Sequence, residues 1–383
     1  MAGSIRKRSK NSYEVTYDAG VDPTTGRRIR RFATVKGTRK DAERALRDSL
    51  HQRDMGIDIE PSKMTVSDFM ERWLRDYAKG NVAPSTFERY SGIVHKHVDP
   101  TIGTVLLTKL RPAHLQAAYA KWQEAKLSPA SVLYHHRVIR EALSHAVGWQ
   151  LLALNPADAA KPPRAERSQV VALEPDGVTE LLTAADVHSE PYPTLIQFAL
   201  ATGMRQGEML GLRWQDTDLS TGTIRVVRTA RRFTGKGIVF GSPKTHRSRR
   251  PVKLDDDTVA LLRAHRARQN EQRLALGSAW EDNDLVFCSP LGAALDGHYV
   301  LKVFQRITVA AGLGKIHFHS LRHTCGTMMA SAGVNPRFIA DRLGHANATF
   351  TLNTYVHTTK DADAEAAERV GEALRAARKH ATS

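Results

Sequence analysis

Four short segments in the second half of the chain carry residues that could break a phosphodiester bond together. Without a metal, such a reaction needs a nucleophile, donors that neutralise the phosphate oxygens, a proton acceptor, and an acid for the leaving 5′ oxygen. The candidates for these roles are Arg205, Lys244, His319, Arg322, His345 and Tyr355. Each of these residue types is common, so the prediction depends on their types, order and local context together.

The first segment, residues 201–214, contains Thr-Gly-Met-Arg. Gly203 would let the backbone turn between two helices, and Arg205 would then begin the second helix. A guanidinium in that position can bind a phosphate through two parallel hydrogen bonds. Glu208 lies one turn further on and could hold the arginine in place. An ordinary ion pair on a helix surface is the simpler alternative.

The second segment, residues 241–250, is expected to be a turn between strands. Lys244 on such a turn could donate a proton to the leaving oxygen, whereas a plain phosphate contact is the alternative. The other cations of this segment, which we expect to contact DNA, are Arg247, Arg249 and Arg250.

The third segment places His319 and Arg322 three residues apart, so that both would lie on one face of a helix and reach one phosphate. His319 and His323 also have the i, i+4 spacing of a zinc-binding pair. However, Ser320 stands where the H-E-x-x-H motif has glutamate, and Arg322 would repel the metal. We therefore expect no metal site and no cofactor.

The fourth segment contains Leu-Gly-His345, followed ten residues later by Tyr355. A tyrosine hydroxyl has an ordinary pKa near 10, so it attacks only when cations stabilise the phenolate or a base removes its proton. A tyrosine that merely packs in a helix is the alternative.

Together, these motifs resemble the active-site set of the tyrosine recombinase (phage integrase) family, in the family's order. The resemblance is close over residues 170–360 and is a matter of pattern alone over residues 1–160. It implies that Arg205, Arg322 and His345 bind the scissile phosphate. It also implies that His319 assists proton transfer from Tyr355 and that Lys244 protonates the departing 5′ hydroxyl.

The same resemblance implies that Tyr355 becomes joined to the 3′ phosphate and that a 5′ hydroxyl of a partner duplex reverses the attack, without ATP or metal. Family members work as tetramers on two DNA sites, through a Holliday junction. Many bury a C-terminal helix in the neighbouring protomer, a role that suits the alanine-rich residues 361–380. A host DNA-bending factor and an excisionase are further expected partners.

The elements around these motifs indicate a multidomain, mainly α protein with an α+β catalytic domain. Residues 1–58 are predicted to form a three-stranded sheet and a helix, which resembles an arm-type DNA-binding domain. An ordinary solvated sheet edge is the alternative. The basic residues expected to bind DNA there are Arg6, Lys7, Arg8, Arg27, Arg28, Arg30 and Arg31.

Residues 61–160 are predicted to form a four-helix, SAM-like core-binding domain, with helices that begin near Thr65, Pro84, Pro112 and Ser128. The proline-rich residues 155–164 are interpreted as a linker. Residues 168–383 are predicted to form the catalytic domain. Its expected elements are helices at 175–186 and 192–214 and strands near 224–227, 238–240 and 251–254.

Composition agrees with a DNA-binding protein. The 383 residues include 56 lysines and arginines against 40 aspartates and glutamates, a formal charge of +16. This excess favours a polyanionic partner, although it could also serve solubility alone. The two cysteines, Cys288 and Cys325, lie in segments expected to be buried, so we expect no disulfide. With no apolar membrane span or signal peptide apparent, a cytoplasmic location is expected.

The sequence therefore predicts a site-specific recombinase that integrates and excises a phage or another mobile element. An integrase is favoured over a chromosome-dimer resolvase because of the additional N-terminal module. Two alternatives remain open: an enzyme like a type IB topoisomerase that relaxes single duplexes, and a DNA-binding regulator without catalysis.

Overall fold

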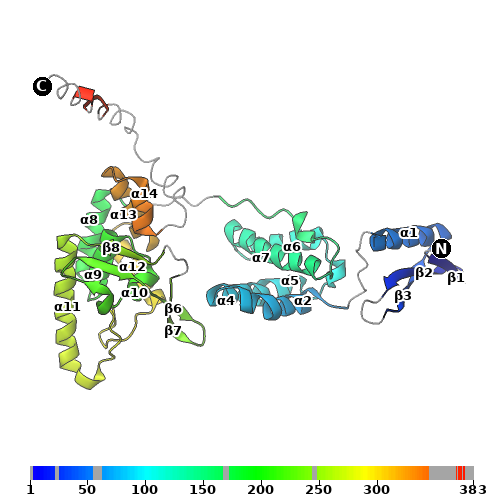
Figure 1. Cartoon of the computed structure of the whole chain (residues 1–383), viewed down its shortest axis with the longest axis horizontal. Helices are drawn as coiled ribbons and strands as arrows, with labels where there is room; N and C mark the ends of the chain where they lie inside the picture. The colour runs from blue at the N-terminus through cyan, green and yellow to red at the C-terminus, as the bar shows by residue number, and fades with distance from the viewer. Residues whose placement is uncertain are drawn as a thin grey trace. The chain divides into compact units, whose positions relative to one another are not determined.

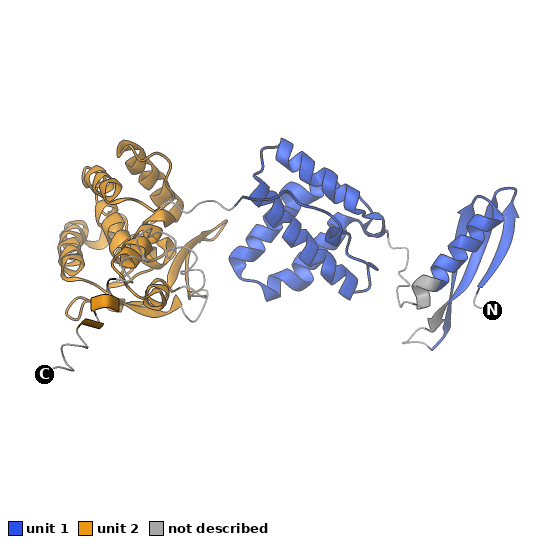
Figure 2. Cartoon of the chain, turned by 90° about the horizontal axis from the view of Figure 1, so that it is seen from above, with its two compact units in different colours: residues 1–167 blue, residues 168–383 orange. Residues whose placement is uncertain are grey.

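The computed structural model describes residues 3–21, 26–54, 63–166, 172–243 and 248–344, together with residues 368, 370–372, 374 and 375. The chain divides into two compact units, residues 1–167 and 168–383 (Figure 2). Within the described ranges, no helix has both the length and the apolar character that crossing a bilayer requires. The predicted boundary between residues 58 and 61 falls outside the described residues, so the division of the first unit into two domains stays a prediction.

The chain begins with a small module of three strands and one helix (Figure 1). Strands β1 (Gly3–Ser9), β2 (Ser12–Val21) and β3 (Arg28–Lys36) pair antiparallel in the order β1-β2-β3. Helix α1 (Arg39–Asp54) packs against the sheet. Val15 on β2 and Ala42 on α1 are fully buried between the two layers. The predicted sheet and helix are confirmed.

The rest of the first unit is helical, and all four predicted helix starts are confirmed. Helix α2 (Val66–Trp73) begins after Thr65, whose side chain forms a capping box with Asp68. Helices α4 (Pro84–Ile93), α6 (Pro112–Glu124) and α7 (Pro129–Gly148) each have proline in the first turn, where no amide donor is needed. The indole of Trp73 donates to His145 Nδ1 at 2.7 Å, which ties α2 to α7.

Two of these helices continue through π-helical turns, which the sequence did not predict. Helix α2 runs through η1 (Leu74–Ala78) into α3 (Lys79–Asn81), and α4 runs through η2 (Val94–Val98) into α5 (Asp99–Ile102). A π turn shifts the register of the following turn on the helix surface. Leu74, Ala78, Val94 and Val98 are thereby all buried in the same core.

The proline-rich segment expected to be a linker partly belongs to the helical core. Asn155 caps the short helix η4 (Pro156–Asp158), and Ala157 and Ala160 are buried against the bundle. The proline content indicated a loop, but it could not show whether the alanines of that loop pack against the helical bundle. The prediction for residues 155–164 is therefore corrected: their first half closes the helical bundle.

The second unit is α+β, as predicted. Helix α9 (Tyr192–Thr202) packs against α8 (Pro175–Asp186), α11 (Asp256–Leu276), α12 (Gly297–Ala310) and α13 (His319–Ser331). Strands β4 (Thr217–Asp218), β5 (Thr223–Val226) and β8 (Arg250–Lys253) form one sheet. Strands β6 (Thr229–Phe233) and β7 (Gly237–Gly241) form a separate hairpin.

Two details of this unit refine the prediction. The helical region expected at residues 192–214 is divided at the predicted Gly203 turn into α9 and the short helix α10 (Gln206–Leu210), and it ends at Leu210. The segment with Lys244 lies between strands β7 and β8, which belong to two different sheets, a detail that the prediction of a turn between strands did not specify. Hydrophobic periodicity in the sequence predicts strands but does not reveal which strands pair, so it could not assign β7 and β8 to different sheets.

Candidate active site

The Thr-Gly-Met-Arg motif forms a sharp turn that presents Arg205. Helix α9 ends at Gly203, which has left-handed backbone angles (φ 62°, ψ 18°). A Cβ atom at this position would lie 2.5 Å from Leu343 Cδ2, so glycine is required both for its backbone angles and for the close approach. Arg205 then occupies the N-cap position of α10. The predicted turn between two helices is confirmed.

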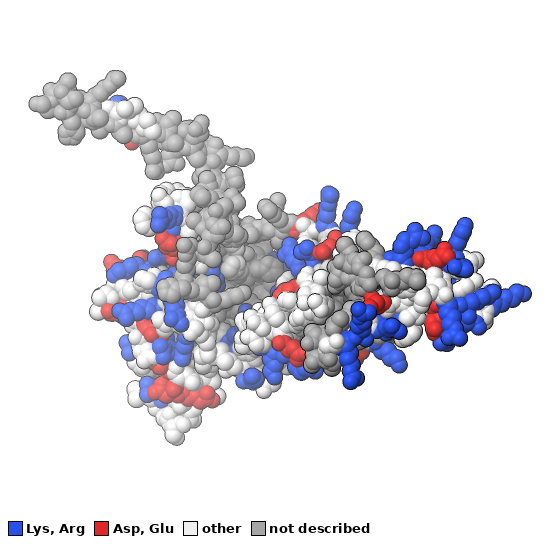
Figure 3. Space-filling view, turned by 45° about the vertical axis from the view of Figure 1, so that its right-hand side comes forward, with Lys and Arg blue, Asp and Glu red and all other residues white. Residues whose placement is uncertain are grey.

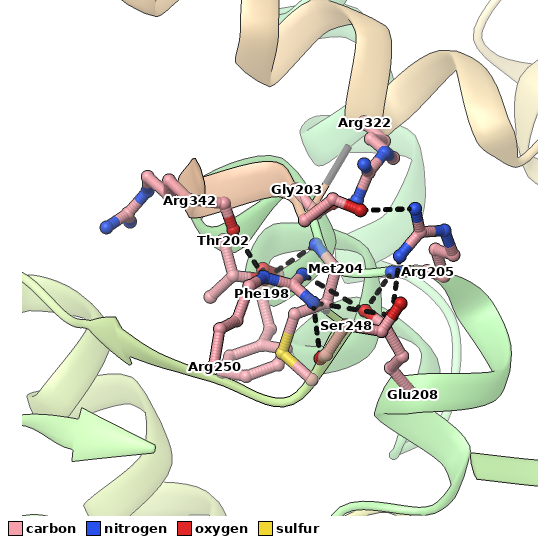
Figure 4. Close-up of polar contacts among 11 residues, drawn as sticks. Phe198, Thr202, Gly203, Met204, Arg205, Glu208, Ser248, Arg250, Arg322 and Arg342 are labelled. Carbon is pink, nitrogen blue, oxygen red and sulfur yellow. Dashed lines mark hydrogen bonds and ion pairs between the residues drawn. The ribbon is translucent and has the colours of Figure 1, made fainter. Parts of the chain in front are cut away.

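The guanidinium of Arg205 is held by two parts of the chain that are far apart in sequence (Figure 4 shows its contact with Glu208). Its Nη1 lies 2.8 Å from Oε1 of Glu208, and its backbone amide donates to Oε2 of the same carboxylate at 3.1 Å. Its Nη2 donates to the carbonyl oxygen of Gly344 at 2.8 Å. The Arg205 side chain stays 38% exposed and can therefore still receive an anion.

Arg322 lies on α13 and contacts the same turn at Gly203. Its side chain is almost fully buried, and its Nη1 donates to the carbonyl oxygen of Gly203 at 2.8 Å. Figure 4 shows this arginine together with Arg205 around the Gly203 turn. One turn of backbone thus places two of the predicted phosphate-binding arginines in a single neighbourhood.

Glu208 is a buried carboxylate that stays charged. Burial alone would raise its pKa, but the charge and hydrogen bonds of Arg250 and then those of Arg205 outweigh burial, so the pKa is lowered. The predicted contact between Glu208 and Arg205 is observed. The ion pair is partly buried, because the Glu208 side chain is 2% exposed and that of Arg205 is 38% exposed.

His319 opens α13, on the same helix as Arg322. Its pKa is lowered because the surrounding protein shields the ring from water and because Arg322 and Arg205 are cationic. His323 packs edge-on against His319, with 4.7 Å between ring centroids, and burial lowers the pKa of His323 to about 4. Both rings are thus neutral at pH 7, and a neutral His319 can accept a proton.

If the chain cleaves DNA as the family resemblance implies, the lowered pKa of His319 predicts an unusual pH dependence of that cleavage. If His319 accepts the proton from the nucleophile, the neutral ring persists to lower pH than an ordinary histidine allows. The acid limb of the single-turnover cleavage rate should therefore have its midpoint below 6.5, the ordinary histidine value. A midpoint at or above 6.5 that disappears in His319→Gln would contradict the assignment.

Arg250, expected to contact DNA, lies instead inside the protein. It is 8% exposed, and its Nη2 lies 3.1 Å from Oε2 of Glu208. This prediction is corrected, because a run of basic residues does not reveal which one turns inward. Its neighbour Arg249 is exposed and donates to Ser242 Oγ at 3.2 Å, so it remains available to an anion.

Several predicted site residues lie outside the described residues, namely Lys244, Arg247, His345 and Tyr355. The residue before His345 is described: Gly344 ends α14 (Pro336–Leu343) with left-handed angles (φ 67°, ψ 48°). Since its carbonyl accepts from Arg205, Gly344 lies at the Arg205 guanidinium. Sequence reasoning missed Arg342, which donates to the carbonyls of Lys253 and Ala201 and so fastens α14 beside this turn.

The basic residues of the N-terminal module divide between two faces of its sheet. Strand register places Arg6 opposite Glu14 and Arg30 opposite Asp18, on the face away from α1. The residues that share the face of buried Val15, which contacts α1, include Lys7 and Arg31.

The remaining predicted DNA-binding residues of this module are Arg8, Arg27 and Arg28. Arg8 forms an ion pair with Glu14, whereas Arg27 and Arg28 lie exposed where β3 begins. Figure 3 shows lysines and arginines crowded over this module, at the right of the view.

Metal-binding potential within the described ranges is confined to one group of three donors. Glu71, His95 and Asp99 offer ligand atoms within 4.8 Å of one another, and Glu71 and His95 are exposed. His95 Nε2 lies 2.6 Å from Glu71 Oε1, so an ordinary hydrogen bond accounts for the proximity of these two residues. The group is in the helical part of the first unit, and we assign it no role in the chemistry.

Comparison with known sequences shows the family. A model of the Phage integrase family matches residues 172–362, and one of the phage integrase N-terminal SAM-like domain matches residues 65–123. An integrase of Mycobacterium phage L5 is 30% identical over 291 residues, which cover 74% of this chain and 73% of that protein. A tyrosine recombinase XerC-like protein of Caldanaerobacter subterraneus subsp. tengcongensis is 27% identical over 384 residues, covering 96% and 97% of the two chains.

Solved structures share the fold. The Tn1549 transposon integrase in complex with transposon right end DNA matches with a TM-score of 0.69 at 21% identity, over 80% of this chain and 100% of that one. A lambda integrase tetramer bound to a Holliday junction matches with a TM-score of 0.58 at 17% identity, over 91% and 96% of the two chains. With its motifs in the expected order and the arginines around one turn, the chain belongs to the phage integrase family of tyrosine recombinases and is a site-specific DNA recombinase.

Proposed function

We propose that this recombinase cleaves DNA by attack of Tyr355 on a phosphodiester, which leaves a 3′-phosphotyrosyl bond and a free 5′ hydroxyl. One observation carries the proposal: Arg205 Nη2 lies 2.8 Å from the Gly344 carbonyl. That hydrogen bond joins the Arg205 turn to the residue preceding His345, 139 positions later in the chain. The proposal is supported because this bond links the Arg205 turn to Gly344, the residue that directly precedes His345 in the sequence.

The proposed roles follow the chemistry of the groups. Arg205 and Arg322, with His345, neutralise the phosphate oxygens as negative charge develops in the transition state. Neutral His319 assists removal of the Tyr355 proton, and Lys244 protonates the departing 5′ oxygen. Because the phosphotyrosyl bond retains the energy of the phosphodiester, a 5′ hydroxyl from a second duplex reverses the attack and completes strand exchange.

The proposed substrates are double-stranded attachment sites of a phage or other mobile element, acted on in the cytoplasm. We propose a tetramer on two such sites, since lambda integrase, which shares this fold, has been solved as a tetramer bound to a Holliday junction. Residues 361–380 would then dock on a neighbouring protomer. Most of that stretch lies outside the described residues, but the described Val370 and Leu374 are 59% and 61% exposed. A host DNA-bending factor and an excisionase complete the proposed set of partners.

A strand-transfer assay tests this function against the two alternatives. The protein is incubated in EDTA with two labelled duplexes that carry the element's attachment sites, and separately with a supercoiled plasmid without them. A recombinase yields products that join the two duplexes, whereas relaxation of the plasmid without joined products indicates a topoisomerase-like enzyme. Binding without any cleavage would favour the regulator.

The sheet of the N-terminal module provides a separate prediction for DNA binding. Arg6 and Arg30 lie on the open face, so Arg6→Ala with Arg30→Ala should weaken binding to arm-type DNA. The slope of log affinity against log salt should become less steep by about 2, roughly 1 for each phosphate that is no longer neutralised. The matched control is Arg44→Ala, an exposed arginine on α1, which should leave the slope unchanged. If wild type and all variants had the same salt-dependence slope, the open face of this sheet would not be the DNA-binding surface.

A further inference from the structure

We propose that Arg250 is a positioning residue for strand cleavage: it holds Glu208 and the end of α14 together, so that Arg205 is fixed between Glu208 and Gly344 for binding the scissile phosphate. The inference rests on the proposed cleavage chemistry and assigns Arg250 a part in it that differs from DNA contact.

The guanidinium of Arg250 contacts three separate segments (Figure 4). Nη2 lies 3.1 Å and Nη1 3.4 Å from the two oxygens of Glu208 on α10. Nη1 also donates to the carbonyl of Ser248 at 3.1 Å, and Nε donates to the carbonyl of Arg342 on α14 at 2.5 Å. All three nitrogens therefore bind protein, and the side chain is only 8% exposed, which favours a role inside the protein.

Glu208 transmits the position of Arg250 to Arg205. The carboxylate is 2% exposed and lies between the two guanidiniums, with Oε1 2.8 Å from Arg205 Nη1. The bidentate pairing fixes the plane of the carboxylate, and the carboxylate in turn fixes Arg205. Without Arg250, Glu208 would keep only one cationic partner in a buried place, and its hold on Arg205 would loosen.

Gly344 packs directly against the Arg250 guanidinium. A Cβ atom at Gly344 would lie 2.8 Å from Nη1 and 3.1 Å from Cζ of Arg250, closer than side chains normally approach. The guanidinium thus supports the Gly344 backbone, while its Nε holds the carbonyl of Arg342 two residues earlier. Since the Gly344 carbonyl accepts from Arg205, Arg250 fixes both the donor and the acceptor of the hydrogen bond that joins the two motifs.

Arginine is needed here because its planar guanidinium binds Glu208, Ser248 and Arg342 at the same time. Lysine would keep the positive charge but offers a single point of contact. It could stay near Glu208 while no longer reaching Arg342 or Ser248. Arg250→Lys should therefore misplace Arg205 and slow cleavage by about 10²-fold, the effect expected of a displacement near 1 Å. DNA affinity should stay within about twofold, because the Arg250 guanidinium is largely buried and binds Glu208, Ser248 and Arg342.

Arg213→Lys is the matched control. Arg213 lies in the same unit and also forms a two-point ion pair, with Nε 2.6 Å and Nη2 3.2 Å from the oxygens of Asp216. This pair involves neither Arg205 nor Glu208, and Arg213 belongs to no predicted DNA-binding set. Disruption of the ion pair should affect stability alone, with cleavage by the folded protein unchanged.

The test measures single-turnover formation of the covalent adduct on a nicked duplex, with wild type, Arg250→Lys and Arg213→Lys. Each is assayed on ordinary DNA and on DNA with sulfur in place of the bridging 5′ oxygen, because a thiolate leaves without a proton donor. DNA affinity and thermal unfolding are measured in parallel. If Arg250→Lys does not fold, the uncharged pair Glu208→Gln with Arg250→Gln replaces it, since it leaves no unpaired charge buried.

The proposal predicts a slow Arg250 variant on both substrates, with normal DNA affinity and a normal Arg213→Lys. A wild-type rate in the Arg250 variant would overturn it. So would a defect that disappears on the sulfur substrate, because Arg250 would then act only through the Lys244 segment. If the Arg250 variant lost only DNA affinity, Arg250 would instead be a DNA-contacting residue, as the sequence analysis expected. Absence of adduct with wild type would instead refute the proposed cleavage chemistry.

Discussion

Tyr355→Phe is expected to abolish the covalent protein–DNA adduct completely while leaving DNA affinity within about twofold of wild type. Phenylalanine retains the ring but lacks the oxygen that attacks phosphorus, and no other group of the proposed site replaces it. The adduct is measured on a nicked duplex, from which the short 5′ fragment diffuses away, followed by a denaturing protein gel.

The control for this change is Tyr299→Phe, which removes the hydroxyl of an exposed tyrosine on α12 in the same unit. It should form adduct at the wild-type rate. Adduct formation by Tyr355→Phe would rule out Tyr355 as the nucleophile, and equal loss in both variants would indicate a general loss of folding.

Arg205→Lys is expected to reduce the cleavage rate by about 10²- to 10³-fold, the effect of removing one oriented donor to an oxyanion. The arginine binds Glu208 and Gly344 at once and still presents its exposed edge to an anion. Lysine has the charge but not the geometry to bind both residues and a phosphate. Single-turnover cleavage and DNA affinity measured on the same nicked duplex separate a catalytic defect from weak binding.

In this experiment, thermal unfolding monitors the integrity of the buried Glu208 pair. A variant that unfolds at the wild-type temperature, binds DNA and cleaves slowly would support the assignment. A variant that cleaves at the wild-type rate would show that Arg205 serves only as an ion pair for Glu208.

Local features of the active site could be predicted from the sequence because short-range geometry determines them. A glycine two residues before an arginine, after an apolar helix, predicted both the turn at Gly203 and the place of Arg205 at the start of the second helix. Proline and hydroxyl residues predicted the helix starts of the first unit for the same reason.

The place of Arg250 could not be predicted in this way. In a segment with Lys244, Arg247 and Arg249, it has the same type and the same local context as its neighbours. Its partners Glu208 and Arg342 lie 42 and 92 positions away, so only the tertiary structure shows that it turns inward. The two π turns were not predicted for a related reason: they depend on the packing of the whole bundle and not on a local sequence signal.

The most direct measurement of the central claim is to identify the amino acid joined to DNA. Adduct formed in EDTA on a nicked attachment-site duplex is digested with protease and nuclease, and the nucleotide-bearing peptide is sequenced by mass spectrometry. The account predicts a single modified peptide with a 3′-linked nucleotide on Tyr355. A nucleotide on another residue, a 5′ linkage, or absence of adduct on a site that the protein binds would contradict it.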